Sequence, residues 1–193
     1  MYEIALVAHL IGVVIGLGAA TVSDLQFMKS LADEKITKVE ENLLSGASLL
    51  IWVGIGIMLL SGGFMFWMNW DVLTSQSRML AHVSIAAVII ANGLWLNISI
   101  APNLDRLSRE KAENREVIPA YLKVRKVAFI SGAVSVSSWW ITFALGMARR
   151  FVFSPPSYFE YMLAYLVVVG LAIGASLTLE KISWKKFLKS QQN

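Results

Sequence analysis

Five long apolar stretches, separated by short polar segments, dominate this chain of 193 residues. They cover residues 4–28, 43–68, 78–100, 127–148 and 157–179. As a helix, each stretch is long enough to cross about 30 Å of hydrocarbon at about 1.5 Å per residue. A lone strand would leave its backbone polar groups unpaired in lipid. The pattern therefore predicts an all-α fold, a single integral membrane bundle of five transmembrane helices over residues 1–193.

Composition agrees with this fold class. Hydrophobic residues make up 56% of the chain and charged residues only 16%, and the mean hydropathy is +0.62, which is too apolar for a soluble domain of this size. The polar segment that starts at Asn103 carries mixed charges at helical spacing, and we expect a solvated helix there, ending near Pro119. A cleaved signal peptide is the alternative for the first stretch, but its acidic start and its length favour a retained span.

The distribution of basic residues predicts the orientation. Of the 17 Lys and Arg residues, 14 follow the first, third and fifth apolar stretches, and only Arg78, Arg149 and Arg150 lie on the opposite side. By the positive-inside rule, the N-terminus lies outside and the C-terminus in the cytoplasm of a bacterial inner membrane. This asymmetry explains the net charge of +4 without nucleic acid, and it favours contact with anionic membrane lipid.

The only two histidines of the chain fall in corresponding places. His9 lies about five residues into the first span and His82 about four residues into the third. Both spans run from outside to inside, so both side chains are expected roughly 6–8 Å below the outer boundary. An ionisable residue inside a bilayer is a functional-site hypothesis by default, and imidazole is a ligand for haem iron, copper and zinc.

Small residues accompany both histidines on the helix faces they would occupy. Residues three, four and seven positions apart share a face, which places Gly12 and Gly16 with His9 and Ala86 with His82. Small side chains leave room for a flat porphyrin between the helices. The alternative for Gly12 and Gly16 is close packing of membrane helices, for which this spacing is typical.

Three arginines are expected near the same surface. Arg78 lies one helical turn before His82, and Arg149 and Arg150 close the fourth span. Guanidinium groups bind carboxylates strongly, so all three are candidates to bind haem propionates. Their alternative role is snorkelling to lipid headgroups.

The ligand inventory favours haem over a bare metal ion. The chain has no Cys, which excludes thiolate sites, and two histidines are too few for a zinc site. Haem needs only two axial ligands. We therefore interpret His9 and His82 as ligands of one haem b in a cytochrome that exchanges electrons with a quinol or a periplasmic redox protein. The alternatives are a copper-handling protein that adds a thioether ligand and a small-solute transporter.

The run from His9 to Phe27, HLIGVVIGLGAATVSDLQF, resembles the first span of small bacterial haem-associated membrane proteins. That group includes the protoporphyrinogen oxidase HemJ and the copper-resistance protein CopD, and the resemblance covers about the first 100 residues. It implies haem association through His9. The HemJ pattern has a lysine in its third span where this chain has His82, which favours bis-histidine haem binding over porphyrinogen oxidation.

Two further features carry expectations. Asp24 lies about 22 Å from His9 along the helix, and we expect it to pair with Arg125 or Lys126, with a proton relay as the alternative. In the second span, Gly56 and Gly63 share a helix face, and we favour internal packing over self-association for them. A homodimer is expected because two-fold dimers are the commonest oligomers.

Overall fold

The computed structural model describes residues 1–33, 38–111, 114–148 and 156–190. Within those ranges the chain is helical and contains no strand. Five segments are long and apolar enough to cross a membrane: Tyr2–Ser30, Lys38–Met68, Ser77–Glu110, Arg115–Met147 and Tyr158–Lys185. The predicted all-α class and the five predicted spans are therefore confirmed.

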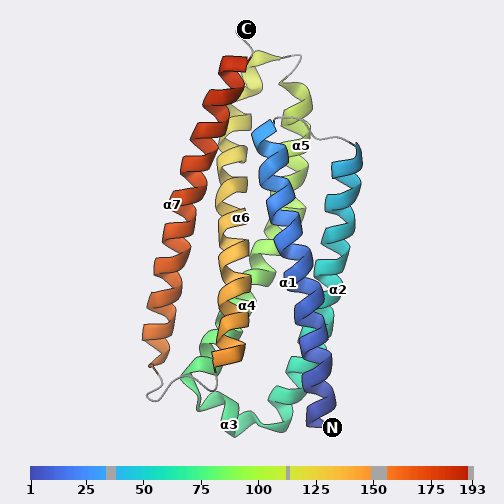
Figure 1. The fold of residues 1–193 in the computed structure, drawn as a ribbon, viewed down its shortest axis with the longest axis vertical. Coiled ribbons are helices and arrows are strands. Elements are labelled where there is room, and N and C mark those ends of the chain that lie inside the picture. The colour runs from blue at the N-terminus through green and yellow to red at the C-terminus, as the bar shows by residue number, and fades with distance from the viewer. Residues whose placement is uncertain (34–37, 112–113, 149–155, 191–193) are drawn as a thin grey trace.

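The long helices lie side by side, and α1 begins at the end of the bundle opposite to the one where α7 ends (Figure 1). They are α1 (Tyr2–Asp33), α2 (Lys38–Met68), α4 (Ser77–Trp95), α6 (Ile118–Met147) and α7 (Tyr158–Ser190). The shorter elements are α3 (Trp70–Thr74), the π-helical η1 (Leu96–Ile100), α5 (Ala101–Glu110) and the 3₁₀-helical η2 (Arg115–Val117). Because α4, η1 and α5 follow one another without a break, they form one continuous third span.

Glycines bring α1 and α2 into backbone contact. A Cβ atom on Gly54 would lie 2.7 Å from Cα of Gly16 and 2.8 Å from the carbonyl oxygen of Gly12. Real Cβ atoms do not approach backbone this closely, so only glycine fits at this crossing. Close helix approach through small residues is the usual basis of membrane helix association, and here it fixes the position of α1 on α2.

The sides of the bundle that face away from its core are apolar. Val14, Leu60 and Leu171 expose 73%, 80% and 71% of their surface. In water such broad apolar faces are unfavourable, whereas in a bilayer they contact acyl chains. The exposed leucines and valines therefore agree with the membrane assignment from the sequence.

Buried apolar residues form layers along the bundle. The cluster that we call the central apolar cluster joins α1, α2, α4 and α6 and consists of Leu17, Ala20, Ile55, Ile89 and Trp139. A second cluster joins η1, α5 and α6 and consists of Ile100, Leu104, Leu107, Tyr121, Ala128 and Phe129. The solvated helix expected after Asn103 exists as α5, but it ends at Glu110 and buries Leu104 and Leu107 against the bundle, so its predicted extent and full solvation were wrong.

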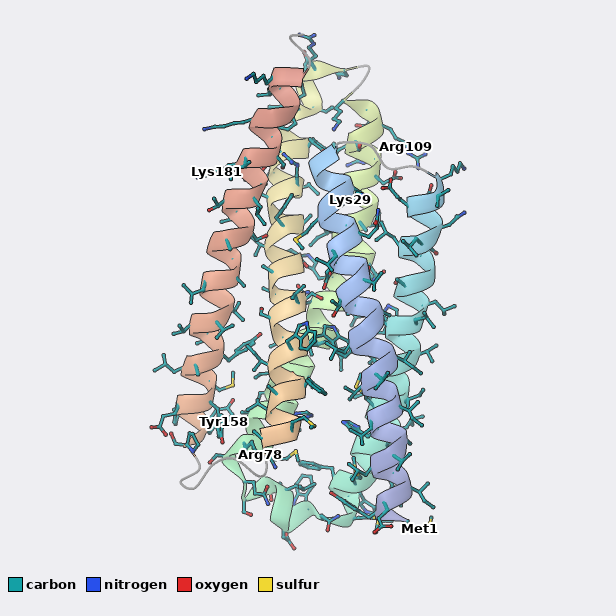
Figure 2. The ribbon with its side chains drawn as sticks, in the orientation of Figure 1. Met1, Lys29, Arg78, Arg109, Tyr158 and Lys181 are labelled. Carbon is teal, nitrogen blue, oxygen red and sulfur yellow. The ribbon has the colours of Figure 1, made fainter. Side chains whose placement is uncertain are left out.

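Different side chains lie at the two ends of the bundle (Figure 2). Lys29, Arg109 and Lys181 lie at one end, and Met1, Arg78 and Tyr158 lie at the other. We call the first the basic end. Its residues belong to the segments in which the sequence concentrates Lys and Arg.

A buried ion pair connects α6 and α7 toward the basic end. Nη1 of Arg125 lies 3.2 Å from Oε1 of Glu180, and the two side chains are 0% and 3% exposed. Arg125 also donates a hydrogen bond of 2.6 Å to Oγ of Ser183. The expectation that Asp24 pairs with Arg125 is therefore wrong, and Lys126 is exposed. Glu180 could not be chosen as the partner from the sequence because the distance between α6 and α7 is a tertiary property.

Candidate functional site

The structure brings the two histidines together from separate helices. The ring centroids of His9 on α1 and His82 on α4 lie 6.4 Å apart, and the ring planes are inclined by 46°. A metal–nitrogen bond is about 2 Å long, so two imidazoles that bind one ion from opposite sides have centroids roughly 6 Å apart. The separation of the rings therefore suits a single metal ion between them.

The hydrogen bond of His9 fixes its tautomer. Its Nδ1 lies 3.2 Å from the carbonyl oxygen of Met58, and a carbonyl only accepts, so Nδ1–H is the donor. Nδ1 also lies 3.3 Å from Oγ of Ser61, whose own hydroxyl donates to the carbonyl of Ile57 over 2.6 Å. The neutral ring then carries its lone pair on Nε2. Orientation of a ligand imidazole by a carbonyl on its other nitrogen is the usual arrangement at metal sites.

His82 is held differently, against α6. Its imidazole lies near the backbone carbonyl of Thr142, and a Cβ on Gly146 would lie 3.8 Å from its Cε1. Nδ1 of His82 is buried and makes no hydrogen bond. A buried polar atom without a partner costs about 1–3 kcal/mol. Such an atom fits a site in which a ligand supplies the missing interaction.

Residues that the sequence did not single out shape the surroundings of the rings. A Cβ on Gly62 would lie 3.2 Å from Cε1 of His9, so glycine leaves the space that this ring occupies. Met58 and Ser61 supply its hydrogen-bond partners, and Gly146 lies beside His82. In the sequence, the adjacent glycines Gly62 and Gly63 of span two are the feature that could have indicated space for a ring. The sequence does not indicate which of the two glycines faces His9.

Gly12 and Gly16, predicted to line a porphyrin, lie at contacts between helices. A Cβ on Gly12 would meet the side chain of Met58 at 2.9 Å, and one on Gly16 would meet the indole of Trp139 at 2.7 Å. Their placement matches the packing alternative. Ala86, one turn along from His82, is half-buried on α4.

Of the three arginines predicted to bind haem propionates, the structure describes only Arg78. Arg78 donates a hydrogen bond of 2.5 Å from Nη1 to the carbonyl oxygen of Leu145, in the last turn of α6. A cation at this position is favourable because helix C-termini carry partial negative charge. Arg149 and Arg150 lie outside the described residues.

No third metal ligand joins the histidines in the part of the chain that the structure describes, where no group of three His, Asp or Glu side chains could hold a metal ion. Two apolar surface grooves, with volumes of about 280 and 400 Å³, run along α1 and between α1 and α2. Ser61 lines the larger one, but neither histidine lines either groove. The site therefore consists of two imidazoles without an adjoining carboxylate.

Comparison with known proteins adds no assignment. A scan against models of protein families, a search of curated proteins and a search of solved structures each found no match to this chain. The resemblance of residues 9–27 to the HemJ and CopD group stays a prediction.

Proposed function

We propose that this chain is an integral membrane cytochrome that binds one haem b through His9 and His82 and transfers electrons. The observation that carries the proposal is the 6.4 Å separation of the two rings. The hydrogen bond from Nδ1 of His9 to Met58 and the unpartnered Nδ1 of His82 support it. The hydrogen bond to Met58 leaves Nε2 of His9 available as a metal ligand. The buried Nδ1 of His82 would be stabilised by an interaction with a bound ligand.

The ligand pair favours electron transfer over catalysis. When protein nitrogens fill both axial positions, haem iron does not readily bind oxygen or substrate, and it supplies one-electron transfer. Met58 and Ser61 keep the ring of His9 in place, while α6 supports that of His82. The partner that donates or accepts electrons is a quinol or a periplasmic redox protein, because the pair lies in the half of the bundle away from the basic end.

The orientation belongs to the same proposal. The basic end, with Lys29, Arg109 and Lys181 (Figure 2), faces the cytoplasm of a bacterial inner membrane by the positive-inside rule. The N-terminus and both histidines then lie toward the periplasm. Arg78, Arg149 and Arg150 are proposed to bind the haem propionates from that side.

Copper handling is the second candidate, and one observation favours it. A porphyrin needs room for a flat ring between the helices, and neither surface groove is lined by a histidine. A single copper ion needs only the gap between two nitrogens, and a methionine thioether would complete a site selective for Cu(I).

Haem binding is tested with full-length protein purified from cells supplied with haem precursor. We expect red protein with a sharp α-band after reduction by dithionite, one haem per chain, and loss of that spectrum in both His9→Ala and His82→Ala. Asn97→Ala is the matched control: it changes an exposed residue of the third span, to which His82 belongs, and it should keep the spectrum. Protein that stays colourless after hemin titration contradicts the haem proposal, and one bound copper without porphyrin supports the second candidate instead.

Self-association is proposed on the outer face of α2. A Cβ on Gly56 or Gly63 would meet nothing within 4 Å, so the internal packing favoured for these two glycines is not what the structure shows. An open face of small residues is available to a second copy of the chain. Cross-linking in native membranes is expected to give a homodimer that Gly56→Leu weakens, and monomer alone or mixed complexes alone contradict it.

A further inference from the structure

A buried polar group that the histidine site does not use lies between α1, α4 and α6. The side chain of Ser135 on α6 is the hydrogen-bonding neighbour of the Asp24 carboxyl on α1. One turn away on α6, the hydroxyl of Ser131 donates to Oδ1 of Asn92 over 2.8 Å. Nδ2 of Asn92 donates in return to the carbonyl of Ser131 over 3.1 Å. These four residues form the polar layer of the bundle.

Apolar residues enclose this layer along α1. Leu17 and Ala20, on the side toward the histidines, belong to the central apolar cluster. Phe27 and Met28, on the side toward the basic end, pack against the second buried cluster. Asp24 is 8% exposed, so its carboxyl is held within the bundle between two layers that exclude water.

Among the residues that the structure describes, no cation balances an ionised Asp24 carboxylate. Its Oδ2 is buried and has no hydrogen-bond partner, and none of the described residues forms an ion pair with it. An isolated carboxylate is far more costly to bury than a neutral carboxyl group. A bound proton removes the charge, and Oδ2 has the open position to carry it.

The charged groups on the packed helices either bond to other residues or lie exposed. Arg125 of α6 and Glu180 of α7 bond to each other, and ten residues, about 15 Å along the helix, separate Arg125 from Ser135. On α2, Glu40 accepts a hydrogen bond of 2.9 Å from Gln26. Lys29 on α1 itself is exposed. None of these groups takes the place of a proton on Asp24.

We propose that Asp24 is a proton-binding site inside the membrane, which takes up and releases a proton while Ser135 holds its carboxyl in place. This site lies about 22 Å from His9 along α1, and proton binding there does not depend on haem. Glu180 is also buried, but it pairs with Arg125.

Infrared difference spectroscopy tests the proposal on the full chain in lipid nanodiscs without added haem. Between low and high pH, we expect a carboxylic C=O band to disappear as the proton leaves. Asp24→Asn should remove this band completely, and Ser135→Ala should shift it to higher wavenumber because a hydrogen bond to the carboxyl is lost. Ser176→Ala is the matched control, since Ser176 is a buried serine that bonds instead to the carbonyl of Phe129, and it should leave the band unchanged.

A second measurement uses the unaltered protein, in case Asp24→Asn does not fold. A hydrophobic carbodiimide adds a protonated carboxyl across its N=C bond: the carboxyl oxygen bonds to carbon, the proton goes to nitrogen, and the acyl group then migrates to give a stable N-acylurea. We expect peptide mapping to find this adduct on Asp24, formed more slowly as the pH is raised, and not on Glu180. A band that does not change over the pH range of the folded protein, or labelling of Asp24 that is absent or independent of pH, overturns the proposal. Loss of the band on adding sodium at constant pH also overturns it, in favour of a cation site.

Discussion

The histidine pair and the Arg125–Glu180 pair each bring together ionisable side chains from two helices, but only Arg125 and Glu180, which are fully buried, bond directly to each other. Arg125 bonds to Glu180 and Ser183 and lies over the ring of Trp184, with 5.3 Å between its guanidinium carbon and the ring centroid. The rings of His9 and His82, in contrast, lie with their centroids 6.4 Å apart. A directly bonded pair stabilises one arrangement of helices, whereas two imidazoles held at this distance leave room for a ligand between them.

The largest effect on stability is expected when Glu180 is replaced. Glu180→Ala leaves Arg125 buried without its counter-ion and should lower the free energy of unfolding by about 3–5 kcal/mol. Denaturation in mixed micelles measures the loss. Replacing both partners together, with Arg125→Met and Glu180→Leu, should recover most of it because no charge is then stranded. A loss below 1 kcal/mol in Glu180→Ala would remove the distinction between the two pairs.

The histidine pair should respond in the opposite way when no ligand is bound. His82→Leu removes an unpartnered buried nitrogen, so the free energy of unfolding of ligand-free protein should stay constant or rise by about 1–3 kcal/mol. The same denaturation assay measures it, while haem or copper binding is lost completely. If His82→Leu destabilises the ligand-free chain as much as Glu180→Ala does, His82 has a structural role and not a ligand-binding one.

The support of His9 can be tested through a matched pair of glycines. Gly54→Ala forces a Cβ into the backbone of Gly16 and should cost about 1–3 kcal/mol as α1 and α2 move apart. His9 belongs to α1, and its ring is oriented by a hydrogen bond to Met58 on α2. Because separation of the two helices weakens this bond, the affinity for the ligand should fall as well. Gly46→Ala, also on α2 but with no atom within 4 Å of the added Cβ, should be neutral or slightly stabilising, since alanine is the better helix former. Equal effects in the two variants, measured by denaturation and hemin titration, would argue against the glycine contact.

The smallest expected effect belongs to Arg78. A positive charge near haem iron favours the reduced state, so Arg78→Ala should lower the midpoint potential by tens of millivolts, as measured by redox titration. Arg78→Lys keeps the charge and should keep most of the potential. If both variants shift it equally, the contribution of Arg78 comes from its hydrogen bond to Leu145 and not from its charge.

Hydropathy alone was enough to predict the five spans, because a bilayer requires long apolar helices whatever surrounds them. It also placed His9 and His82 at one depth, since the rise per residue of a helix is fixed. The sequence could not predict the rotation of each helix about its axis, because residues that face lipid and residues that face the core are both apolar here.

Tertiary structure decided everything that depends on that rotation. Gly54 faces α1, whereas Gly56 lies on the outer face of α2. Arg125 pairs with Glu180 and not with Asp24, and the ring of His9 bonds to the carbonyl of Met58. Each of these outcomes depends on which side chains meet between helices, and packing geometry selects among them because a bilayer gives little hydrophobic preference for one helix face over another. The sequence by itself determined the spans and the shared depth of the histidines, and the packing of the helices determined their partners.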